Sequence, residues 1–390
     1  MITFEEAQQI IISSIKLLDT EEIFFQDASG RILADAVFAD DDMPPFSRSA
    51  MDGFALRAED QDMLLDIIEE IPAGKFPAKK IGKGQCAKIM TGAPIPPGCN
   101  MVVRVEDTGI DKSGQMQVIV KGAISNIRVQ GEDVKKHQNI INPGQLIKNQ
   151  HIGMMAMAGC TRPVVYRKPS VGILTTGSEL VAPDEKPERS QIRNSNGPML
   201  LSQLSGLGLE ATNYGVAPDD PEKMQKRIRQ AIDQQDVVLI SGGVSAGDYD
   251  YVPGILKEIG MEIRIHKMKV RPGKPLLFAV NEHKYVFGLP GNPVSTFVQF
   301  ECLIKPFLLR LMGNESSDIR IKMVMGTDYP HKDSDLRFFI PVRFDGTGVV
   351  PIEYHGSGHL TSYTLAEGIL DIPPGISYIH KGETVNVIPI

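Results

Sequence analysis

The chain lacks the features that mark secreted, membrane-spanning or zinc-binding proteins. It has no tryptophan and only four cysteines, which stand far apart with no Cys-x-x-Cys pair. That spacing argues against a disulfide framework and against a zinc site. No apolar run reaches the roughly 18 residues that span a bilayer, and the N-terminus has no basic region followed by an apolar core. We expect a cytoplasmic protein with no membrane partner.

A basic excess is missing as well. The net charge is −7 at pH 7, whereas proteins that bind nucleic acid usually carry an excess of lysine and arginine. We therefore expect no nucleic-acid partner. What remains is the composition of an ordinary globular protein, with 42% hydrophobic and 23% charged residues. With 390 residues the chain is too long for one core, and about two to four domains are expected.

The hydrophobic pattern changes along the chain and predicts domains of different class. Residues 3–18 have the spacing of an amphipathic helix, and residues 22–168 contain short apolar segments between Gly/Pro turns, typical of β lobes. From about residue 170, strands alternate with helical patterns, which indicates a doubly wound, mostly parallel α/β sheet. Residues 314–390 return to short strands. The predicted fold class is therefore multi-domain: a central doubly wound α/β domain, N-terminal mixed and β lobes, and a small C-terminal all-β domain.

Three glycine-containing loops in the central domain directly follow predicted strands. They span residues 175–179, 241–247 and 288–293. Parallel strands end at one edge of a sheet, so all three loops should meet at the carboxyl edge, where open α/β sheets bind ligands. In the last loop, glycine permits close approach to the backbone, two prolines fix the shape, and the following helix start favours an anion. Together the loops predict a ligand pocket, although each alone also fits a routine turn.

A basic segment precedes the last loop. Lys267, Lys269 and Arg271 alternate with Met268 and Val270, which on a strand places the three cations on one face. Like charges on one face repel unless water or an anion screens them. The pattern favours a phosphate-bearing ligand; the alternative is a solvated edge strand guarded by lysine.

Carboxylates accompany the same loops: Glu179, Asp219, Asp220, Asp248 and Asp250. Mg²⁺ is commonly bound by a few carboxylates together with phosphate oxygens, so acids beside a phosphate site fit that metal. Each has an ordinary alternative as a helix cap or a solvated loop residue, and Asp219 is a candidate cap for the helix that begins at Pro221. The sequence shows no Ser/His/Asp order, no histidine metal spacing, no Walker A sequence and no dinucleotide Gly-x-Gly-x-x-Gly.

Several segments together resemble one family. They are SAMDGFA (49–55), MTGAP (90–94), GED (131–133), TTGSEL (175–180), SGGVS (241–245), PGKP (272–275) and GLPGNP (288–293). In this order they are similar to the molybdopterin molybdenumtransferases, the MoeA-like proteins related to the E domain of gephyrin. The first two of these segments, at 49–55 and 90–94, have no residue spacing that by itself predicts a reaction.

The resemblance implies insertion of molybdate into adenylylated molybdopterin with release of AMP, and a requirement for Mg²⁺. It also implies a homodimer of elongated four-domain subunits, with a pocket between the central domain of one subunit and the second domain of the other. We expect the domains at residues 1–38 with 125–168, 39–124, 169–313 and 314–390. Besides adenylylated molybdopterin and molybdate, the expected partners are the adenylyltransferase and molybdoenzyme maturation proteins.

The match to family motifs also implies the site residues. The expected polar and acidic group is Asp52, Thr91, Asp133, Glu179, Asp219 and Asp250, of which Glu179 and Asp250 would hold Mg²⁺. The expected substrate-binding group is Lys267, Arg271, Ser241, Gly242, Gly243, Pro290, Gly291 and Pro293. Two departures stand out: Arg271 replaces a common lysine, and Ile340-Pro341 occupy the neighbourhood of a terminal-domain arginine. Arg337 and Arg343 are candidates to replace that arginine, and Ser357 is a weak match.

Two other functions are compatible with parts of the pattern. One is a non-catalytic pterin-binding scaffold, which a long linker and a fused adenylyltransferase domain would favour; the sequence shows neither. The other is a molybdopterin adenylyltransferase, whose fold resembles the central domain alone. The flanking domains and the 241–245 loop weigh against it. Molybdate and tungstate have nearly the same size and charge, so the sequence does not separate them.

Overall fold

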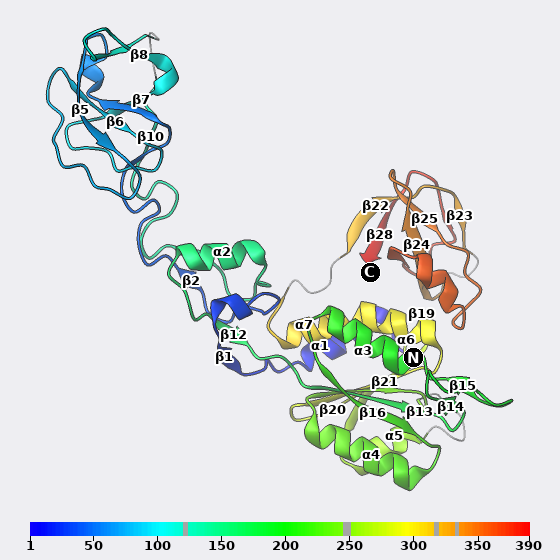
Figure 1. Cartoon of the computed structure of the whole chain (residues 1–390). Coiled ribbons are helices and arrows are strands. Elements are labelled where there is room, and N and C mark those ends of the chain that lie inside the picture. Colours follow the sequence, from blue (N-terminus) through cyan, green and yellow to red (C-terminus); the bar gives the residue numbers. More distant parts are fainter. Residues whose placement is uncertain (120–123, 245–250, 316–319, 332–334) are drawn as a thin grey trace.

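The computed structural model describes residues 1–119, 124–244, 251–315, 320–331 and 335–390. The chain is elongated: an arm leaves the central unit and carries a separate β lobe at its far end, while the C-terminal β unit lies beside the helix layer of the central unit (Figure 1). In the described residues, no helix is both long and apolar enough to cross a membrane.

The central unit is built on a six-stranded sheet in the order β16-β13-β17-β21-β20-β18. Strands β16, β13, β17 and β21 are parallel, and β20 and β18 complete the sheet in antiparallel pairings. The bounds are β13 (Val171–Thr176), β16 (Ala211–Ala217), β17 (Val237–Ser241), β18 (Glu262–Lys267), β20 (Pro275–Asn281) and β21 (Lys284–Leu289). The prediction of a mostly parallel central sheet is confirmed.

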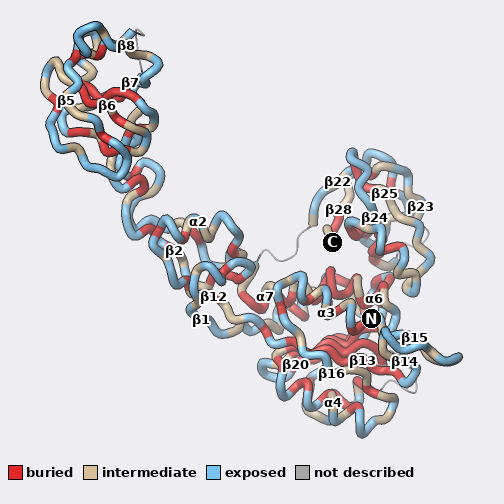
Figure 2. The backbone as a smooth tube through the Cα atoms, viewed as in Figure 1, coloured by how far each residue is buried: buried red, intermediate tan, exposed pale blue. Residues whose placement is uncertain are grey.

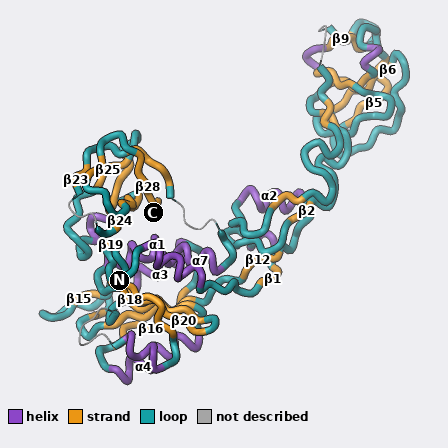
Figure 3. The backbone as a smooth tube through the Cα atoms, turned by 180° about the vertical axis from the view of Figure 1, so that it is seen from behind, coloured by secondary structure: helices purple, strands orange, loops and turns teal. Residues whose placement is uncertain are grey.

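Helices cover both faces of this sheet (Figure 3). One face packs against α1, α3 and the long helix formed by α6, the π-helical turn η4 and α7. The other face packs against α4 and α5. The bounds are α1 (Phe4–Ser13), α3 (Asn196–Gly206), α4 (Pro221–Gln234), α5 (Val252–Glu258), α6 (Pro293–Gln299), η4 (Phe300–Ile304) and α7 (Lys305–Leu311). Because both faces are covered, the inner strands β13, β17, β20 and β21 are buried almost throughout (Figure 2), which explains their continuous apolar runs. The edge strands β16 and β18 are only partly buried.

The prediction of one strand over residues 261–270 is wrong after Lys267. Strand β18 ends at Lys267, and β19 (Val270–Arg271) pairs instead with β24 of the C-terminal unit. Met268 and Val270 are buried as predicted, each 1% exposed. A period of two predicts which side chains are buried, but it does not show that the chain passes from one sheet to another.

The C-terminal unit is a second six-stranded sheet, in the order β19-β24-β26-β28-β22 with β25 paired to β24. Its own core includes Phe338, Leu370 and Val387. A short helical turn, η5 (Leu360–Leu365), packs beside it. The bounds are β22 (Ile321–Val324), β23 (Tyr329–Pro330), β24 (Arg337–Phe344), β25 (Val349–Pro351), β26 (Gly368–Ile372), β27 (Tyr378–Ile379) and β28 (Thr384–Pro389).

The arm and the distal lobe are mostly β, and each has a core of its own. The lobe holds a four-stranded sheet, β5-β6-β4-β7. Bounds in the arm are β1 (Thr20–Glu22), η1 (Phe25–Asp27), β2 (Val37–Phe38), β11 (Asn139–Ile141), α2 (Asn149–Met157) and β12 (Val164–Tyr166). Bounds in the lobe and its base are β3 (Arg48–Ser49), β4 (Gly53–Leu56), η2 (Ala58–Asp60), β5 (Asp66–Ile71), β6 (Gln85–Ile89), β7 (Met101–Arg104), η3 (Val105–Asp107), β8 (Thr108–Ile110), β9 (Met116–Val118) and β10 (Ile127–Arg128).

Helix α1 packs in the central unit rather than in the arm. Thr3 and Glu6 form the predicted capping box at its start, and Phe4, Ala7 and Ile11 lie in the same apolar core as the central sheet. The sequence predicts residues 1–38 as part of the N-terminal domain, whereas the side chains of α1 pack in the core of the central sheet. The four domain limits themselves stay predictions.

Candidate functional site

The first and third predicted loops and the described part of the second, residues 241–244, meet at the carboxyl edge of the central sheet. Thr175 is in register with Ser241, and Ser241 with Leu289, so the strands end side by side. The loops enclose a cavity of about 630 Å³, called here the first cavity. Eight of the predicted site residues line it: Glu179, Asp219, Ser241, Gly242, Gly243, Pro290, Gly291 and Pro293.

The glycines of the middle loop are required by close packing. Gly242 and Gly243 have φ values of 99° and 64°, a region that side chains with a Cβ rarely adopt. A Cβ on Gly242 would lie 2.5 Å from the carbonyl oxygen of Thr176. Backbone amides of this loop can therefore come close to a ligand.

Asp219 and Asp220 have different tasks. Asp220 caps α4, because its Oδ1 accepts a hydrogen bond from the Lys223 amide at 3.0 Å. Asp219 instead exchanges two bonds with Ser178: the Ser178 amide donates to Asp219 Oδ2 at 2.9 Å, and the Asp219 amide donates to Ser178 Oγ at 3.0 Å. Asp220, not Asp219, is thus the cap of α4. Asp219 joins the loop after β16 to the loop after β13 at the first cavity.

The carboxylates at the first cavity are the candidate Mg²⁺ ligands. Glu179 and Asp219 bring two carboxylates to the first cavity, while Asp250, the second predicted Mg²⁺ ligand, lies outside the described residues, as does Asp248. Over the residues that the structure describes, no group of three or more His, Cys, Asp or Glu is arranged to hold a metal. A magnesium ion with one or two protein carboxylates and several phosphate or water ligands fits this donor set; an all-protein cage does not.

Asn196, which we did not single out from the sequence, holds two of the loops together. Asn196 as a whole residue is 7% exposed. Its Nδ2 donates to Ser241 Oγ at 2.7 Å and to the Gly291 carbonyl at 2.8 Å. Nearby, Asn194 Nδ2 donates to Thr175 Oγ1 at 3.0 Å. The signal was the Asn-Ser-Asn run at 194–196, which leads into the first residue of α3, where polar residues commonly begin a helix.

Replacing Asn196 by alanine is expected to loosen the first cavity. The change removes both donated bonds and leaves the Gly291 carbonyl without this donor, so we expect a loss of about 1–3 kcal/mol in the free energy of unfolding. Urea denaturation of Asn196→Ala measures it. The matched control is Asn139→Ala, because Asn139 is exposed in the arm, and its loss should stay within about 0.5 kcal/mol. Equal losses for the two variants would contradict the role of Asn196.

A second cavity, of about 860 Å³, lies between the central unit and the C-terminal unit. Arg271 and Lys274 line it, with residues 354–359 on the opposite side. Asn292 Nδ2 donates to Ser357 Oγ at 2.9 Å and joins the two sides. The second cavity shares a wall with the first, formed by Pro275, Pro290 and Asn292.

The two predicted cations separate. Arg271 is exposed and lines the second cavity, whereas Lys267 is half-buried at the end of β18, opposite Pro275. Among the residues described around the two cavities, Lys267 lines neither. Lys274 takes the place beside Arg271 that the sequence suggested for Lys267. Arg271 also acts on Tyr354: burial raises the pKa of that hydroxyl to about 12, and the charge of Arg271 acts in the opposite direction.

Three predicted residues, Asp52, Thr91 and Asp133, belong to the lobe or its base by sequence and strand pairing, and the lobe stands away from the central unit (Figure 1). Asp52 Oδ1 accepts hydrogen bonds from the Thr91 amide at 2.7 Å and from Thr91 Oγ1 at 2.8 Å. Backbone and side-chain bonds from Thr91, in that order, hold the pKa of Asp52 below its usual value. Asp52, Thr91 and Asp133 are all exposed. The lobe therefore presents an ionised carboxylate at the surface.

Arg337 has a structural role. It is 8% exposed, and its Nη1 donates to both carboxylate oxygens of Asp371 at 2.8 Å. Its Nη2 donates to Glu5 of α1 at 2.5 Å. Arg343 is exposed on β24, and neither arginine is among the described residues that line the two cavities. Neither Arg337 nor Arg343 therefore supplies, at the two cavities, the arginine that the family resemblance implies for the C-terminal domain.

Comparisons with known proteins cover the chain almost from end to end. Three family descriptions match: "MoeA N-terminal region (domain I and II)" at residues 2–159, "Probable molybdopterin binding domain" at 172–310 and "MoeA C-terminal region (domain IV)" at 324–390. A molybdopterin molybdenumtransferase of Staphylococcus epidermidis is 33% identical over 99% of this chain and 95% of its own length. One from Staphylococcus aureus is 32% identical with the same coverage.

Solved structures agree with these matches. The molybdopterin biosynthesis moeA protein of Pyrococcus horikoshii superposes with a TM-score of 0.87 at 29% identity, over 100% of both chains. Since the matches include the arm, the lobe and the C-terminal unit, they exceed what a lone central domain would give. The chain therefore belongs to the molybdopterin molybdenumtransferase family and is a transferase of molybdenum cofactor biosynthesis.

Proposed function

We propose that this enzyme inserts molybdate into adenylylated molybdopterin, releases AMP and requires Mg²⁺. The observation that carries the proposal is the shared wall of the two cavities, formed by Pro275, Pro290 and Asn292. A reaction between a large pterin nucleotide and a small oxyanion needs two adjoining compartments, one for each substrate. The chain has a glycine-lined compartment next to a cation-lined one.

In the first cavity, the glycine loop 241–243 and the proline loop 290–293 accommodate the pterin and its phosphates. Glu179 and Asp219 supply carboxylates, and by its motif Asp250 belongs with them. These residues would hold Mg²⁺ through one or two carboxylates and the substrate phosphates, which is the usual binding mode of that ion. Bound there, the ion would neutralise charge on the phosphates.

In the second cavity, Arg271 and Lys274 bind molybdate. A guanidinium offers a planar pair of donors and an ammonium a compact charge, and together they replace the hydration of a tetrahedral dianion with fixed donors. The shared wall sets the oxyanion next to the pterin. Lys267, half-buried at the end of β18, adds positive charge nearby without lining the cavity.

The lobe completes the site from a second subunit. Asp52, Thr91 and Asp133 match family motifs, are exposed and are not among the described residues that line the two cavities, and the lobe stands away from the central unit of its own chain (Figure 1). A homodimer in which the lobe of one protomer covers the cavities of its partner brings the groups together, and this is the quaternary structure that we propose. A cytoplasmic location, the four expected domain limits, and exchange with the adenylyltransferase and molybdoenzyme maturation proteins belong to the same proposal.

The test is AMP release by purified protein supplied with adenylylated molybdopterin, molybdate and Mg²⁺. We expect release that depends on molybdate and on Mg²⁺, and about a hundredfold slower release by Glu179→Ala, because a group acting on charge in the reacting complex is lost. Asp220→Ala is the matched control, since that carboxylate caps α4. Pterin nucleotide binding without AMP release would support a scaffold instead, and AMP release independent of molybdate would contradict the proposal.

A further inference from the structure

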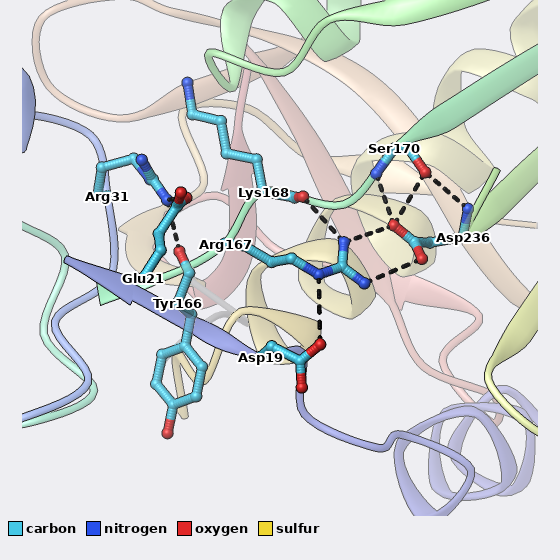
Figure 4. A network of polar contacts seen from close by, with 8 residues as sticks. All are labelled: Asp19, Glu21, Arg31, Tyr166, Arg167, Lys168, Ser170 and Asp236. Atoms are coloured by element: carbon cyan, nitrogen blue, oxygen red, sulfur yellow. Dashed lines mark hydrogen bonds and ion pairs between the residues drawn. The ribbon is translucent and has the colours of Figure 1, made fainter. Parts of the chain in front are cut away.

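The chain crosses between the central unit and the arm twice. The first crossing follows α1 and includes Asp19; the second runs from Arg167 to Ser170, directly before β13. Figure 4 shows the polar contacts that connect the two crossings to each other and to the central sheet. We call Asp19, Arg167, Ser170 and Asp236 the joint.

The centre of the joint is a two-pronged ion pair. Arg167 Nη1 lies 2.7 Å from Asp236 Oδ2, and Nη2 lies 3.1 Å from Oδ1. Asp236 Oδ2 also accepts hydrogen bonds from the Ser170 amide at 2.8 Å and from Ser170 Oγ at 2.9 Å. The Asp236 side chain is only 14% exposed, so this carboxylate is fixed from several directions.

The first crossing is attached to the same arginine. The Arg167 amide donates to the Asp19 carbonyl at 2.9 Å, and Arg167 Nε lies 4.0 Å from Asp19 Oδ2. At the base of the arm, Arg31 donates to the Tyr166 carbonyl at 2.8 Å and pairs with Glu21. Both crossings are thus held against one edge of the central sheet.

Apolar packing at this place is incomplete. Ile32, Leu146 and Tyr166 of the arm pack against the central core, but a cavity of about 520 Å³ opens beside them, lined among others by Leu17, Tyr166 and Arg310. Apolar contacts are not directional, so they keep the arm attached without fixing its angle. A bidentate guanidinium–carboxylate pair has a defined geometry. The Arg167–Asp236 pair therefore fixes the angle of the arm that the apolar contacts leave free.

The pair stays ionised at neutral pH. Burial alone would raise the pKa of Asp236, but hydrogen bonds from Arg167 and from Ser170 outweigh burial and hold the pKa below its usual value. A lowered pKa stabilises the folded state above the unfolded pKa of about 4, and that contribution is lost as the pH falls through the folded value. The joint is therefore fully formed at the pH of an ordinary assay.

We propose that Arg167 is a positioning residue for molybdenum transfer: through Asp236 it fixes the angle at which the arm carries Asp52 and Thr91. Asp236 directly precedes β17, and the other end of that strand carries Ser241 at the first cavity. The arm is thus aligned to the same strand that forms the pocket. This inference rests on the proposed function, which places the lobe over the cavities of the partner subunit.

The experiment compares full-length wild type with Arg167→Ala by X-ray scattering and by molybdate-dependent AMP release. Without the pair, we expect a broader distribution of interatomic distances at large separations. We also expect kcat to fall about ten- to a hundredfold, because small displacements of positioned groups have effects of that size. The molybdate KM should change little, since Arg271 and Lys274 are untouched. Arg167→Lys keeps the charge but not the fork, so it should recover part of kcat.

Arg162→Ala is the matched control, because Arg162 pairs with Glu22 on the exposed surface of the arm, at 3.6 Å. It should behave as wild type in both measurements. Light scattering and circular dichroism confirm that the variants keep the mass and fold of wild type. Unchanged scattering, or changed scattering with unchanged kcat, in Arg167→Ala overturns the inference. If wild type itself releases no AMP in the presence of molybdate, the proposed function is wrong, and scattering alone then decides whether Arg167 fixes the arm.

Discussion

Co-expression of Asp52→Ala and Glu179→Ala chains is expected to restore AMP release that each variant alone has lost. Asp52 lies on the exposed lobe and Glu179 at the first cavity of the central unit. If the lobe of one protomer completes the cavity of the other, a mixed dimer contains one site with both residues intact. Among dimers selected to contain one chain of each kind, one site of two is intact, so we expect about half of wild-type activity. Each variant alone should lose about a hundredfold or more.

The measurement is the rate of AMP release by protein carrying two different affinity tags and purified through both. The control pairs Glu179→Ala with a chain that carries Asp52→Ala and Glu179→Ala together. No mixed dimer of that pair has an intact central cavity, so its activity should stay at the level of the single variants. If dimers of one Asp52→Ala chain and one Glu179→Ala chain, purified through both tags, recover no activity, the site is not shared between subunits.

Removal of the Arg271 side chain is expected to raise the molybdate KM about ten- to a hundredfold, because hydrogen bonds to a charged group are worth about 1.5–3 kcal/mol. Arg271 lines the second cavity beside Lys274. Affinity for the pterin nucleotide should change far less, since that substrate occupies the first cavity in our proposal. Initial rates of Arg271→Ala at varied molybdate, with the pterin nucleotide saturating, give the constant.

Lys269→Ala provides the control for charge alone. Lys269 is two residues away and exposed, and it lines a different cavity near Met1. The Lys269→Ala variant loses the same charge from the same segment as Arg271→Ala. If direct contact with molybdate is what matters, the molybdate KM of Lys269→Ala should stay within about twofold of wild type. A rise as large as that of Arg271→Ala would attribute the effect to the general field of the basic segment.

The fold was predictable wherever the determining signal is local. The loops at 175–179, 241–247 and 288–293 carry glycine and proline directly after apolar runs, and the first and third of them and the described part of the second lie where a parallel sheet places them. At Lys267 the alternation shifts its phase: the inward side chains are Ile263 and Ile265 before the switch and Met268 and Val270 after it. A shift of phase marks an irregularity but does not predict which sheet the chain joins next. Which sheet accepts Val270 depends on β24, which begins at Arg337.

The candidate site was predictable by residue type more than by arrangement. Family motifs identified Asp52 and Thr91, but their hydrogen bonds join residues 39 positions apart, and no periodicity predicts such a contact. Asn196 escaped notice because an asparagine at a helix start has an ordinary explanation. Its bonds to Ser241 and Gly291 arise only when three separate loops have come together.

The position of α1 has a consequence for synthesis of the chain. Phe4 meets the ring of Phe339 at 5.2 Å between centroids, and Glu5 pairs with Arg337, so α1 packs against a strand that is synthesised 332 residues later. At about 5–20 residues per second, roughly 15–70 s separate the appearance of these partners. During that interval the apolar side of α1, with Phe4, Ala7 and Ile11, has no complete core to enter. The arm and lobe can fold in the meantime, and the central unit closes around its own N-terminus afterwards.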